Sequence, residues 1–298
     1  MGYTSQSRVH AQALVTLTRL CIAPVPTWLD IARLCGVGDA PTPLELEPLD
    51  EQHVRVRIAL PANEAADVAA RLRGLGIDGR ALEVTSEPPL ARSLVRAARL
   101  RDARARRLTS QGFTRPGAVA SGAGRYSLTP EALALELGRL AAGARVLDAC
   151  CGSGGNSIGF ARAGSPVQAI ELDAERLAEA RVNARLYGVG GQIRFSEGDA
   201  LELLREHEAE LLFVDPPWGE HYDKRSSSRA SFPLLDALLA LDLRRFRELW
   251  LKLPSSFEVA SIPGARPTAW FGSAPGDWRR IKFLLLRVPT SALGGGPG

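Results

Sequence analysis

The chain has 298 residues, a hydrophobic content of 45% and a formal net charge of +4 at pH 7, so it exceeds a typical single domain and two domains are expected. Its four cysteines lack metal-ligand spacing and two of them are adjacent, which favours a reducing cytoplasm over a disulfide framework and indicates no metal. Residues 11–23 are too polar and too short for a signal peptide or a membrane span, so we expect a cytoplasmic protein without a membrane partner.

The first part of the chain predicts a small α+β module. The expected elements are a helical stretch that Pro24 and Pro26 end, a helix over 28–35 that Gly36 stops, a strand over 53–60, a helix over 63–75 and a strand over 81–85. Pro41, Pro43 and Pro48 indicate a loop before the first strand.

An arginine-rich helix is predicted next. Between residues 92 and 107 lie seven arginines and one acid, and Arg92, Arg96 and Arg99 fall with Arg106 and Arg107 on one side at helical spacing. A solvated surface helix would show the same pattern. Because guanidinium groups bind phosphates, and because the helix precedes the segment over residues 148–218 whose catalytic character is argued below, we interpret Arg92, Arg96 and Arg99 as RNA contacts.

Residues 115–124 are rich in Gly, Ala and Ser and predict a linker. We therefore expect an accessory, RNA-binding domain over 1–114, a catalytic domain over 115–293 and a disordered tail over 294–298. The alternating apolar runs and helical stretches of the second domain predict a doubly wound α/β sheet, in which ligands bind at the carboxyl ends of the strands. Its expected strands are 144–147, 167–172, 192–195, 211–214, 249–253, 268–271 and 281–288, with helices over 130–140, capped by Thr129, and over 174–187.

A glycine-rich loop follows the first of these strands, over Asp148-Ala-Cys-Cys-Gly-Ser-Gly-Gly-Asn156. Gly152 and Gly154 allow a ligand to approach the backbone at the start of a helix, but the spacing departs from the dinucleotide fingerprint. Glu171 ends the next strand, where an acid can bind both hydroxyls of a ribose, and Asp199 follows the third strand, where it can accept from an adenine amine. Each acid alone also fits a turn or a helix cap, but their order along successive strand ends favours a nucleoside cofactor.

Asp215-Pro216-Pro217-Trp218 ends the fourth strand. The carboxylate of Asp215 and the carbonyl of Pro216 can accept both hydrogens of an amine on a flat base, and Trp218 can stack on the ring. A plain strand-ending turn has similar composition. The polar residues 219–231 that follow are interpreted as a mobile substrate loop, although a disordered surface loop would have the same composition.

Together these segments resemble the class I S-adenosylmethionine-dependent methyltransferases, and among them the RNA cap guanine-N2 methyltransferases, or trimethylguanosine synthases. The resemblance covers roughly residues 125 to 260 and rests on four strings: Ser127-Leu-Thr-Pro-Glu131, the glycine loop ending in Asn156, Ala169-Ile-Glu-Leu-Asp173 and Pro216-Pro-Trp-Gly219. It implies a Rossmann-like fold. The synthases have Ser where this chain has Asp215, and an acid at that position is typical of the wider amino-methyltransferase class, including rRNA guanine-N2 enzymes.

The resemblance also implies roles for individual residues. Thr129 and its neighbours would close over the methionine end of S-adenosylmethionine, and Trp218 would stack on guanine. Asp148, Gly152 and Asn156 would line the cofactor. Glu171 would hold its ribose, and Asp199 would bind its adenine.

We thus predict an S-adenosylmethionine-dependent methyltransferase acting on guanine N2 in RNA. A DNA adenine-N6 or protein glutamine methyltransferase would use the same tetrapeptide, and a non-catalytic RNA-binding protein could retain the fold.

Overall fold

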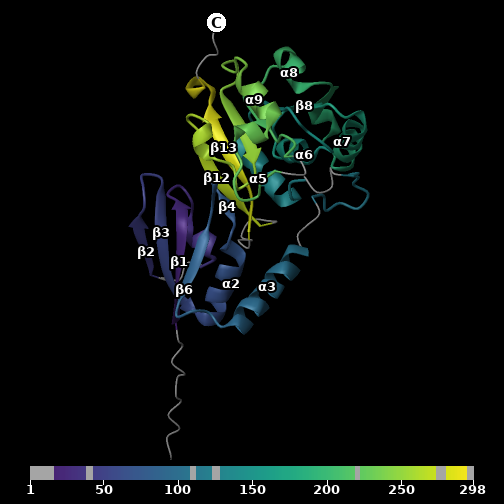
Figure 1. Ribbon diagram of the computed structural model, residues 1–298. Coiled ribbons are helices and arrows are strands. Elements are labelled where there is room, and N and C mark those ends of the chain that lie inside the picture. The colour runs from purple at the N-terminus through teal and green to yellow at the C-terminus, as the bar shows by residue number, and fades with distance from the viewer. Residues whose placement is uncertain are drawn as a thin grey trace, which may run out of the picture.

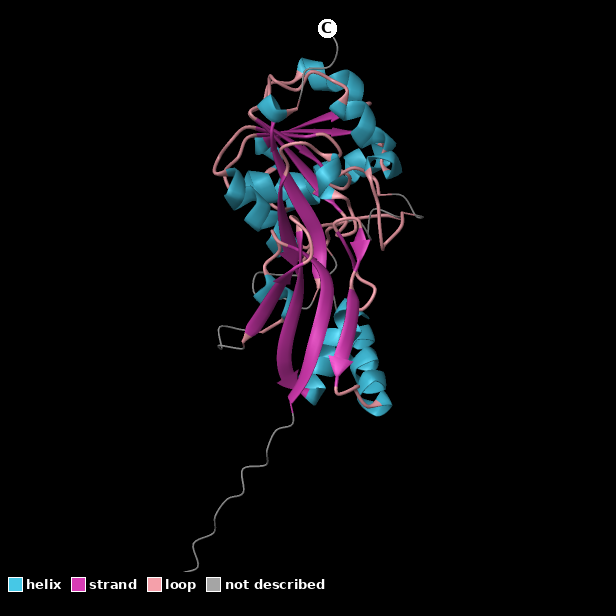
Figure 2. Ribbon diagram, turned by 60° about the vertical axis from the view of Figure 1, so that its left-hand side comes forward, coloured by secondary structure: helices cyan, strands magenta, loops and turns pink. Residues whose placement is uncertain are grey.

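The computed structural model describes residues 17–37, 43–107, 112–122, 128–218, 222–272 and 280–293. These residues form two main β-sheets, one from the N-terminal part of the chain and one from the rest (Figure 1). The two sheets lie end to end, and helices flank each of them (Figure 2).

The N-terminal sheet has four antiparallel strands in the order β2-β3-β1-β6. Its strands are β1 (Leu17–Pro26), β2 (Leu44–Pro48), β3 (His53–Pro61) and β6 (Glu83–Glu87). The helices of this part are α1 (Ile31–Cys35), α2 (Ala62–Leu72) and α3 (Arg92–Arg107), and a short hairpin joins β4 (Gly76–Ile77) to β5 (Arg80–Ala81). The predicted α+β character and the predicted α3 are confirmed.

Two N-terminal predictions are wrong. The segment predicted as a first helical stretch is strand β1, because Thr18, Leu20 and Ile22 alternate with more exposed residues and are buried on one face. Pro24 is accommodated where the register between β1 and β3 shifts, as prolines in sheets commonly are. The segment predicted as a loop before the first strand contains β2, which pairs with β3 at the edge of the sheet.

The second sheet has seven strands in the order β12-β13-β11-β10-β7-β8-β9. They are β7 (Val146–Asp148), β8 (Val167–Glu171), β9 (Ile193–Glu197), β10 (Leu211–Val214), β11 (Glu248–Leu253), β12 (Arg266–Phe271) and β13 (Ile281–Pro289). The strands from β9 to β11 run parallel, and β13 runs antiparallel to both β11 and β12. The predicted doubly wound sheet is confirmed.

Helices cover both faces of this sheet. On one face α5 (Glu131–Ala141), α6 (Gly155–Arg162) and α7 (Ala174–Leu186) enclose an apolar core with the strands. The other face packs against α8 (Ala200–Leu203) and α9 (Pro233–Leu239). The remaining short helices are η1 (Gly190–Gln192), η2 (Leu204–Glu206), η3 (Arg229–Ser231), η4 (Val259–Ser261) and η5 (Thr290–Ala292). The prediction that Thr129 caps α5 is wrong, because the N-cap residue of this helix is Pro130.

The N-terminal part is joined to the second sheet near the end of β11. A single apolar cluster extends from the N-terminal sheet to the α9 face of the larger sheet. In the β4–β5 hairpin, the Asp78 amide donates to Ser255 O at 3.0 Å, and Asp78 Oδ1 accepts from the Val259 amide at 2.7 Å. A Cβ on Gly76 would lie 2.4 Å from Arg225 O, so the hairpin also abuts the predicted substrate loop. The N-terminal part therefore touches the segment that follows the tetrapeptide.

The predicted linker lies against α7 where it is described. The Val119 amide donates to Asn183 Oδ1 at 2.8 Å, and Asn183 Nδ2 donates back to Val119 O at 2.7 Å. The Ser121 amide donates to Glu179 Oε1. The domain boundary at residue 114 stays a prediction, since residues 108–111 and 123–127 lie outside the described residues, as does the predicted tail.

Candidate active site

The glycine loop connects β7 to α6 at the carboxyl edge of the sheet. Gly152 and Gly154 have φ values of +53° and +93°, in the left-handed region that favours glycine. A Cβ on Gly154 would lie 3.1 Å from Ala180 Cβ, so a close helix packing also requires glycine there. At Gly152 the same Cβ would meet no described atom within 4 Å, so this residue borders open space.

Asp148, at the end of β7, is completely buried. Its Oδ2 accepts a 2.6 Å hydrogen bond from Ser157 Oγ on α6. The pKa of Asp148 is raised to about 7, chiefly by burial; the Ser157 hydrogen bond opposes this rise and the nearby Asp215 carboxylate adds to it. The carboxyl group therefore changes its charge near neutral pH.

Three buried polar atoms near this loop have no hydrogen-bond partner among the described residues: Asp148 Oδ1, Asn156 Oδ1 and Thr129 Oγ1. Buried polar atoms are nearly always hydrogen-bonded in folded proteins, so unpaired ones need an explanation. Asp148 and Asn156 offer acceptors, and Thr129 offers a hydroxyl. This donor and acceptor set fits a polar ligand with a cationic amine.

Glu171 ends the neighbouring strand β8, where its carboxylate is held by backbone donors. Glu171 Oε2 accepts from the Gly152 amide at 2.8 Å, and Oε1 accepts from the Asp173 amide at 3.1 Å. Asp199 caps α8 after β9 and accepts from the Leu201 amide at 2.8 Å. Asp173 caps α7 and accepts from the amides of Glu175 and Arg176.

The acids predicted from separate strand ends come together around Cys150. The pKa of this half-buried thiol is raised well above its usual range, first by desolvation and then by the negative charges of four acids: Asp148, Glu171, Asp215 and Asp199. Each of the four acids ends or follows one of four parallel strands, so the four side chains lie at the carboxyl edge of the sheet.

Asp215, at the end of β10, is linked to both neighbouring strand ends. Its Oδ2 accepts from Asn156 Nδ2 at 3.1 Å and from Lys252 Nζ at 2.5 Å. Burial raises the pKa of Asp215, while Lys252 and the Asn156 hydrogen bond oppose this increase. Because Asn156 and Lys252, the donors to this carboxylate among the described residues, both bind Oδ2, Asp215 can offer Oδ1 to a substrate.

Trp218 packs beside this carboxylate. Its Nε1 lies 3.4 Å from Lys252 O, and its ring contacts Tyr222 edge to face with centroids 5.7 Å apart. Lys252 Nζ lies 5.4 Å from the centroid of the Trp218 ring. The aromatic plate and the carboxylate thus share one lysine neighbour. Pro216, which lies between them in the chain, is buried.

Lys252 was not predicted from the sequence as a site residue. The signal was present, since a lysine interrupts the otherwise apolar residues 249–253 of a predicted buried strand. A charged side chain is rarely buried unless it has a partner. The partner, however, lies 37 residues earlier in the chain and only the pairing of β10 with β11 reveals it.

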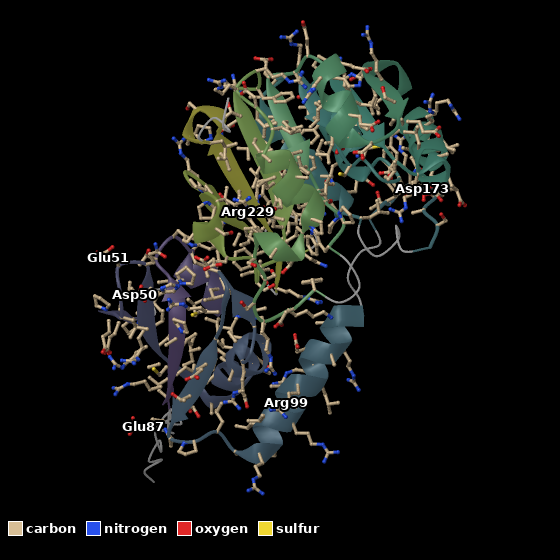
Figure 3. All side chains as sticks on the ribbon, turned by 45° about the horizontal axis from the view of Figure 1, so that its top comes forward. Asp50, Glu51, Glu87, Arg99, Asp173 and Arg229 are labelled. Carbon is tan, nitrogen blue, oxygen red and sulfur yellow. The ribbon has the colours of Figure 1, made fainter. Side chains whose placement is uncertain are left out.

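The predicted RNA contacts lie elsewhere, on α3 of the N-terminal part. Arg92, Arg96 and Arg99 are exposed, and Ala98 on the other side of the helix is buried against the N-terminal core. The side chains of Arg106 and Arg107 lie outside the described residues. Figure 3 shows Arg99 well separated from Asp173, which follows β8.

A hollow of about 590 Å³ opens along this helix. Arginine side chains and apolar side chains line it, namely Arg73, Arg92, Arg96 and Arg99 with Leu90, Val95 and Leu100. All three predicted RNA contacts therefore border one concave, basic surface. This surface does not include the carboxyl edge of the larger sheet, where the acids of the candidate site lie.

Within the described ranges, His, Cys, Asp and Glu side chains form no cluster of three or more suited to a metal ion. In the same residues, no helix has the length and apolar character needed to cross a membrane.

Residues 143–252 match a family model described as RNA cap guanine-N2 methyltransferase. The chain carries a class I methyltransferase domain that resembles this family. It is 34% identical over 104 residues to trimethylguanosine synthase of Schizosaccharomyces pombe, covering 32% of this chain and 43% of the relative. It is 31% identical over 104 residues to the Saccharomyces cerevisiae synthase, covering 32% and 33%. The chain thus spans less than half the length of these relatives.

Solved structures similar to this chain include TrmN from Thermus thermophilus. That chain is 21% identical, with a TM-score of 0.38 over 91% of this chain and 99% of its own length. An RNA methyltransferase from Salinibacter ruber, crystallised with S-adenosyl-L-homocysteine, is 18% identical with a TM-score of 0.36, covering 58% of this chain and 94% of its own.

The residues present fit S-adenosylmethionine as the cofactor. The unpaired Asp148 Oδ1 and Asn156 Oδ1 suit its ammonium group, and Gly152 leaves room beside the loop. Glu171 and Asp199 stand at the next two strand ends, in the order that ribose and adenine require.

Proposed function

We propose that this chain is an S-adenosylmethionine-dependent RNA methyltransferase that modifies the N2 amine of guanine. The observation that carries the proposal is the contact between Asn156 and Asp215, because it joins the cofactor loop to the amine-binding tetrapeptide at one edge of the sheet. The similarity to trimethylguanosine synthases, which act on guanine, supports the choice of base.

In the proposed cofactor site, Thr129, Asp148, Gly152, Gly154 and Asn156 surround the methionine end. Glu171 binds the ribose hydroxyls and Asp199 binds the adenine amine. When bound, the cofactor supplies a methyl group that its sulfonium already activates.

In the proposed substrate site, Trp218 stacks on guanine. Asp215 Oδ1 and the carbonyl oxygen of Pro216 accept the two amine hydrogens, which draws the nitrogen lone pair out of conjugation and toward the methyl group. With the cofactor bound, the nitrogen–carbon bond would form as the sulfur–carbon bond breaks, and the amine would then lose one proton. Asp215, whose pKa burial raises, is placed to accept that proton. Orientation and fixed charges supply most of the acceleration.

RNA is the proposed substrate class because the N-terminal part offers a concave basic surface. Arg92, Arg96 and Arg99 border the hollow along α3, where they would bind phosphates while the apolar side chains contact sugar or base. In this proposal residues 1–114 form the RNA-binding domain and 115–293 the catalytic domain. The four free cysteines accord with a reducing compartment, and we place the protein in the cytoplasm.

The direct test is transfer of a labelled methyl group to three substrates in parallel: total RNA, duplex DNA and glutamine-containing peptides. Label in RNA alone is expected. Label in DNA or peptide would support the corresponding alternative instead. Calorimetry with S-adenosylmethionine addresses the non-catalytic alternative, because a protein that binds the cofactor but labels nothing would not be an active methyltransferase under these conditions.

A further inference from the structure

Lys252 stands directly across from Asp215 in the catalytic sheet. Strands β10 and β11 are parallel, with Val214 opposite Leu251. The residues that follow, Asp215 and Lys252, therefore lie opposite each other at the carboxyl edge of the sheet. Leu251 and Leu253, on either side of the lysine, are completely buried, and Lys252 is only 4% exposed. The strand therefore carries one ammonium group into an otherwise apolar interior.

Burial of that ammonium group carries a desolvation cost. Such a charge persists in a folded protein when a close partner offsets its lost hydration. Asp215 Oδ2 lies 2.5 Å from Lys252 Nζ, and the faces of Trp218 and Phe283 lie 5.4 and 5.5 Å away. Replacing a buried ion pair with apolar residues is often neutral or stabilising, so packing alone does not account for a lysine here.

The ion pair acts on the carboxylate that the proposed mechanism uses. With Lys252 and Asn156 both donating to Oδ2, the orientation of the Asp215 carboxylate is fixed at that oxygen. The other oxygen, Oδ1, is left to accept an amine hydrogen. An ionised carboxylate accepts two hydrogens more strongly than a protonated one, which would itself donate at one oxygen.

We propose that Lys252 is a positioning residue for methyl transfer, which keeps Asp215 ionised and directs its free oxygen to the substrate amine. This inference rests on the proposed function as an amine methyltransferase, but it does not depend on which base is modified. By this inference strand β11 contributes a residue to the site, Lys252, in addition to the tetrapeptide that follows β10.

The charges around Asp215 make this contribution necessary. Asp148 on β7 interacts with Asp215, and the Glu171 carboxylate on β8 acts on Asp148 in turn. Asn156 on α6 adds a neutral donor, and Lys252 on β11 supplies the positive charge that opposes the effect of burial. Without that positive charge, the pKa of Asp215 would rise further, and the protonated acid would lose its acceptor function at neutral pH.

The test compares Lys252→Met, which removes the charge, with Lys252→Arg, which retains it. Single-turnover methyl transfer is measured from pH 6 to 9 at saturating S-adenosylmethionine, so that titration of Asp148 in the cofactor site does not limit the rate. The Met variant should lose roughly tenfold or more of the rate at pH 7, since one pKa unit changes the ionised fraction up to tenfold, and should recover as the pH rises. The Arg variant should keep the pH profile of the unsubstituted protein.

A second measurement needs no substrate. Carbon-13 NMR of labelled aspartate carboxyls, with Asp215 assigned by Asp215→Asn, reports the pKa of Asp215 directly. Lys252→Met should move this pKa upward and Lys252→Arg should not. Thermal unfolding of Lys252→Met and of Lys252→Met with Asp215→Asn checks folding, and the double variant should regain stability because no unpaired carboxylate remains.

The outcomes separate the two proposals. Failure of the unsubstituted protein to transfer methyl groups to any amine would remove the proposed function and this inference with it. Normal transfer with the same pH profile in Lys252→Met, an equal loss at every pH, or an unmoved Asp215 pKa would overturn the role of Lys252 alone.

Discussion

Asn156 Nδ2 donates a 3.1 Å hydrogen bond to Asp215 Oδ2, so the first turn of α6 is bonded to the end of β10 across 59 residues of sequence. The contact makes the glycine loop and the tetrapeptide parts of one site. It also means that a change on the cofactor side can alter the carboxylate that faces the substrate.

The first prediction separates alignment of the amine from stacking of the base. Asp215→Asn keeps the shape of the side chain but replaces one acceptor with a donor, so the single-turnover rate should fall far more than RNA affinity, as expected for a contact used mainly in the transition state. Trp218→Ala should instead weaken RNA binding by roughly 1–3 kcal/mol.

Trp218→Phe serves as the matched control, because it retains an aromatic face and should recover part of the lost affinity. Full single-turnover activity in Asp215→Asn would show that the carboxylate does not align the amine, even with the fold intact.

The second prediction concerns the ribose acid. Glu171→Ala should weaken S-adenosylmethionine binding by roughly 1–3 kcal/mol, because charge-assisted hydrogen bonds to the ribose are lost. The change also removes the acceptor of the Gly152 amide, so the loop loses one support. Calorimetry measures the affinity, and the exposed Glu175→Ala on α7 is the control. Equal affinities in both variants would remove Glu171 from the cofactor site.

The third prediction uses the pKa of Asp148, which burial raises to about 7. Below that pH the carboxyl group is neutral and above it is charged. Since a cationic ammonium prefers the charged form, affinity for S-adenosylmethionine should rise between pH 6 and 8, with proton release on binding near pH 6.5. Calorimetry in buffers of different ionisation enthalpy detects the proton. In Asp148→Asn the affinity should become independent of pH in this range.

The same raised pKa predicts a stability effect in the absence of the cofactor. The folded protein holds the Asp148 proton more tightly than the unfolded chain does, so this group's contribution to stability is greatest at acid pH and decreases as pH rises from about 4 to about 7. Thermal unfolding of the protein and of Asp148→Asn over this range measures the contribution. An identical pH dependence in both proteins would contradict the raised pKa.

The fourth prediction concerns the basic hollow. Replacing Arg92, Arg96 and Arg99 with Gln should lower RNA affinity and reduce the salt slope by about 2 to 3, since each phosphate contact contributes roughly 0.7–0.9. Cofactor affinity should not change, because these residues border the hollow on α3 and not the catalytic edge.

The matched control replaces three other exposed arginines, Arg139, Arg145 and Arg247, with Gln, which changes the net charge equally. Filter binding at several salt concentrations gives both slopes. The same reduction in both triple variants would assign the effect to overall charge and return α3 to an ordinary solvated surface.

The catalytic sheet could be predicted because its strands are short apolar runs, and Leu211–Val214 was placed with both ends correct. Strand β1 could not, because Pro24 and Pro26 suggested a break, whereas pairing with β3 and β6 on both sides sustains the strand through a register shift. The local sequence pattern predicts that a strand is buried, but only its pairing with neighbouring strands determines whether a proline ends it.

The candidate site shows the same division. Asp148, Glu171, Asp199 and Asp215 could be placed at one edge because parallel strands end together there. The contacts between them could not, since hydrogen bonds such as Asn156 to Asp215 depend on side-chain geometry. Lys252 was overlooked for this reason, although its charge in an apolar strand was visible.

The proposed function is transfer of a methyl group from S-adenosylmethionine to the N2 amine of guanine in RNA. The most direct measurement is incubation of total RNA with S-adenosylmethionine carrying a deuterated methyl group, followed by digestion to nucleosides and mass spectrometry, with Asp215→Asn as the inactive control. Deuterated N2-methylguanosine is expected with the unsubstituted protein and not with the control. Deuterium in N6-methyladenosine, or in no nucleoside at all while cofactor binding is intact, would contradict it.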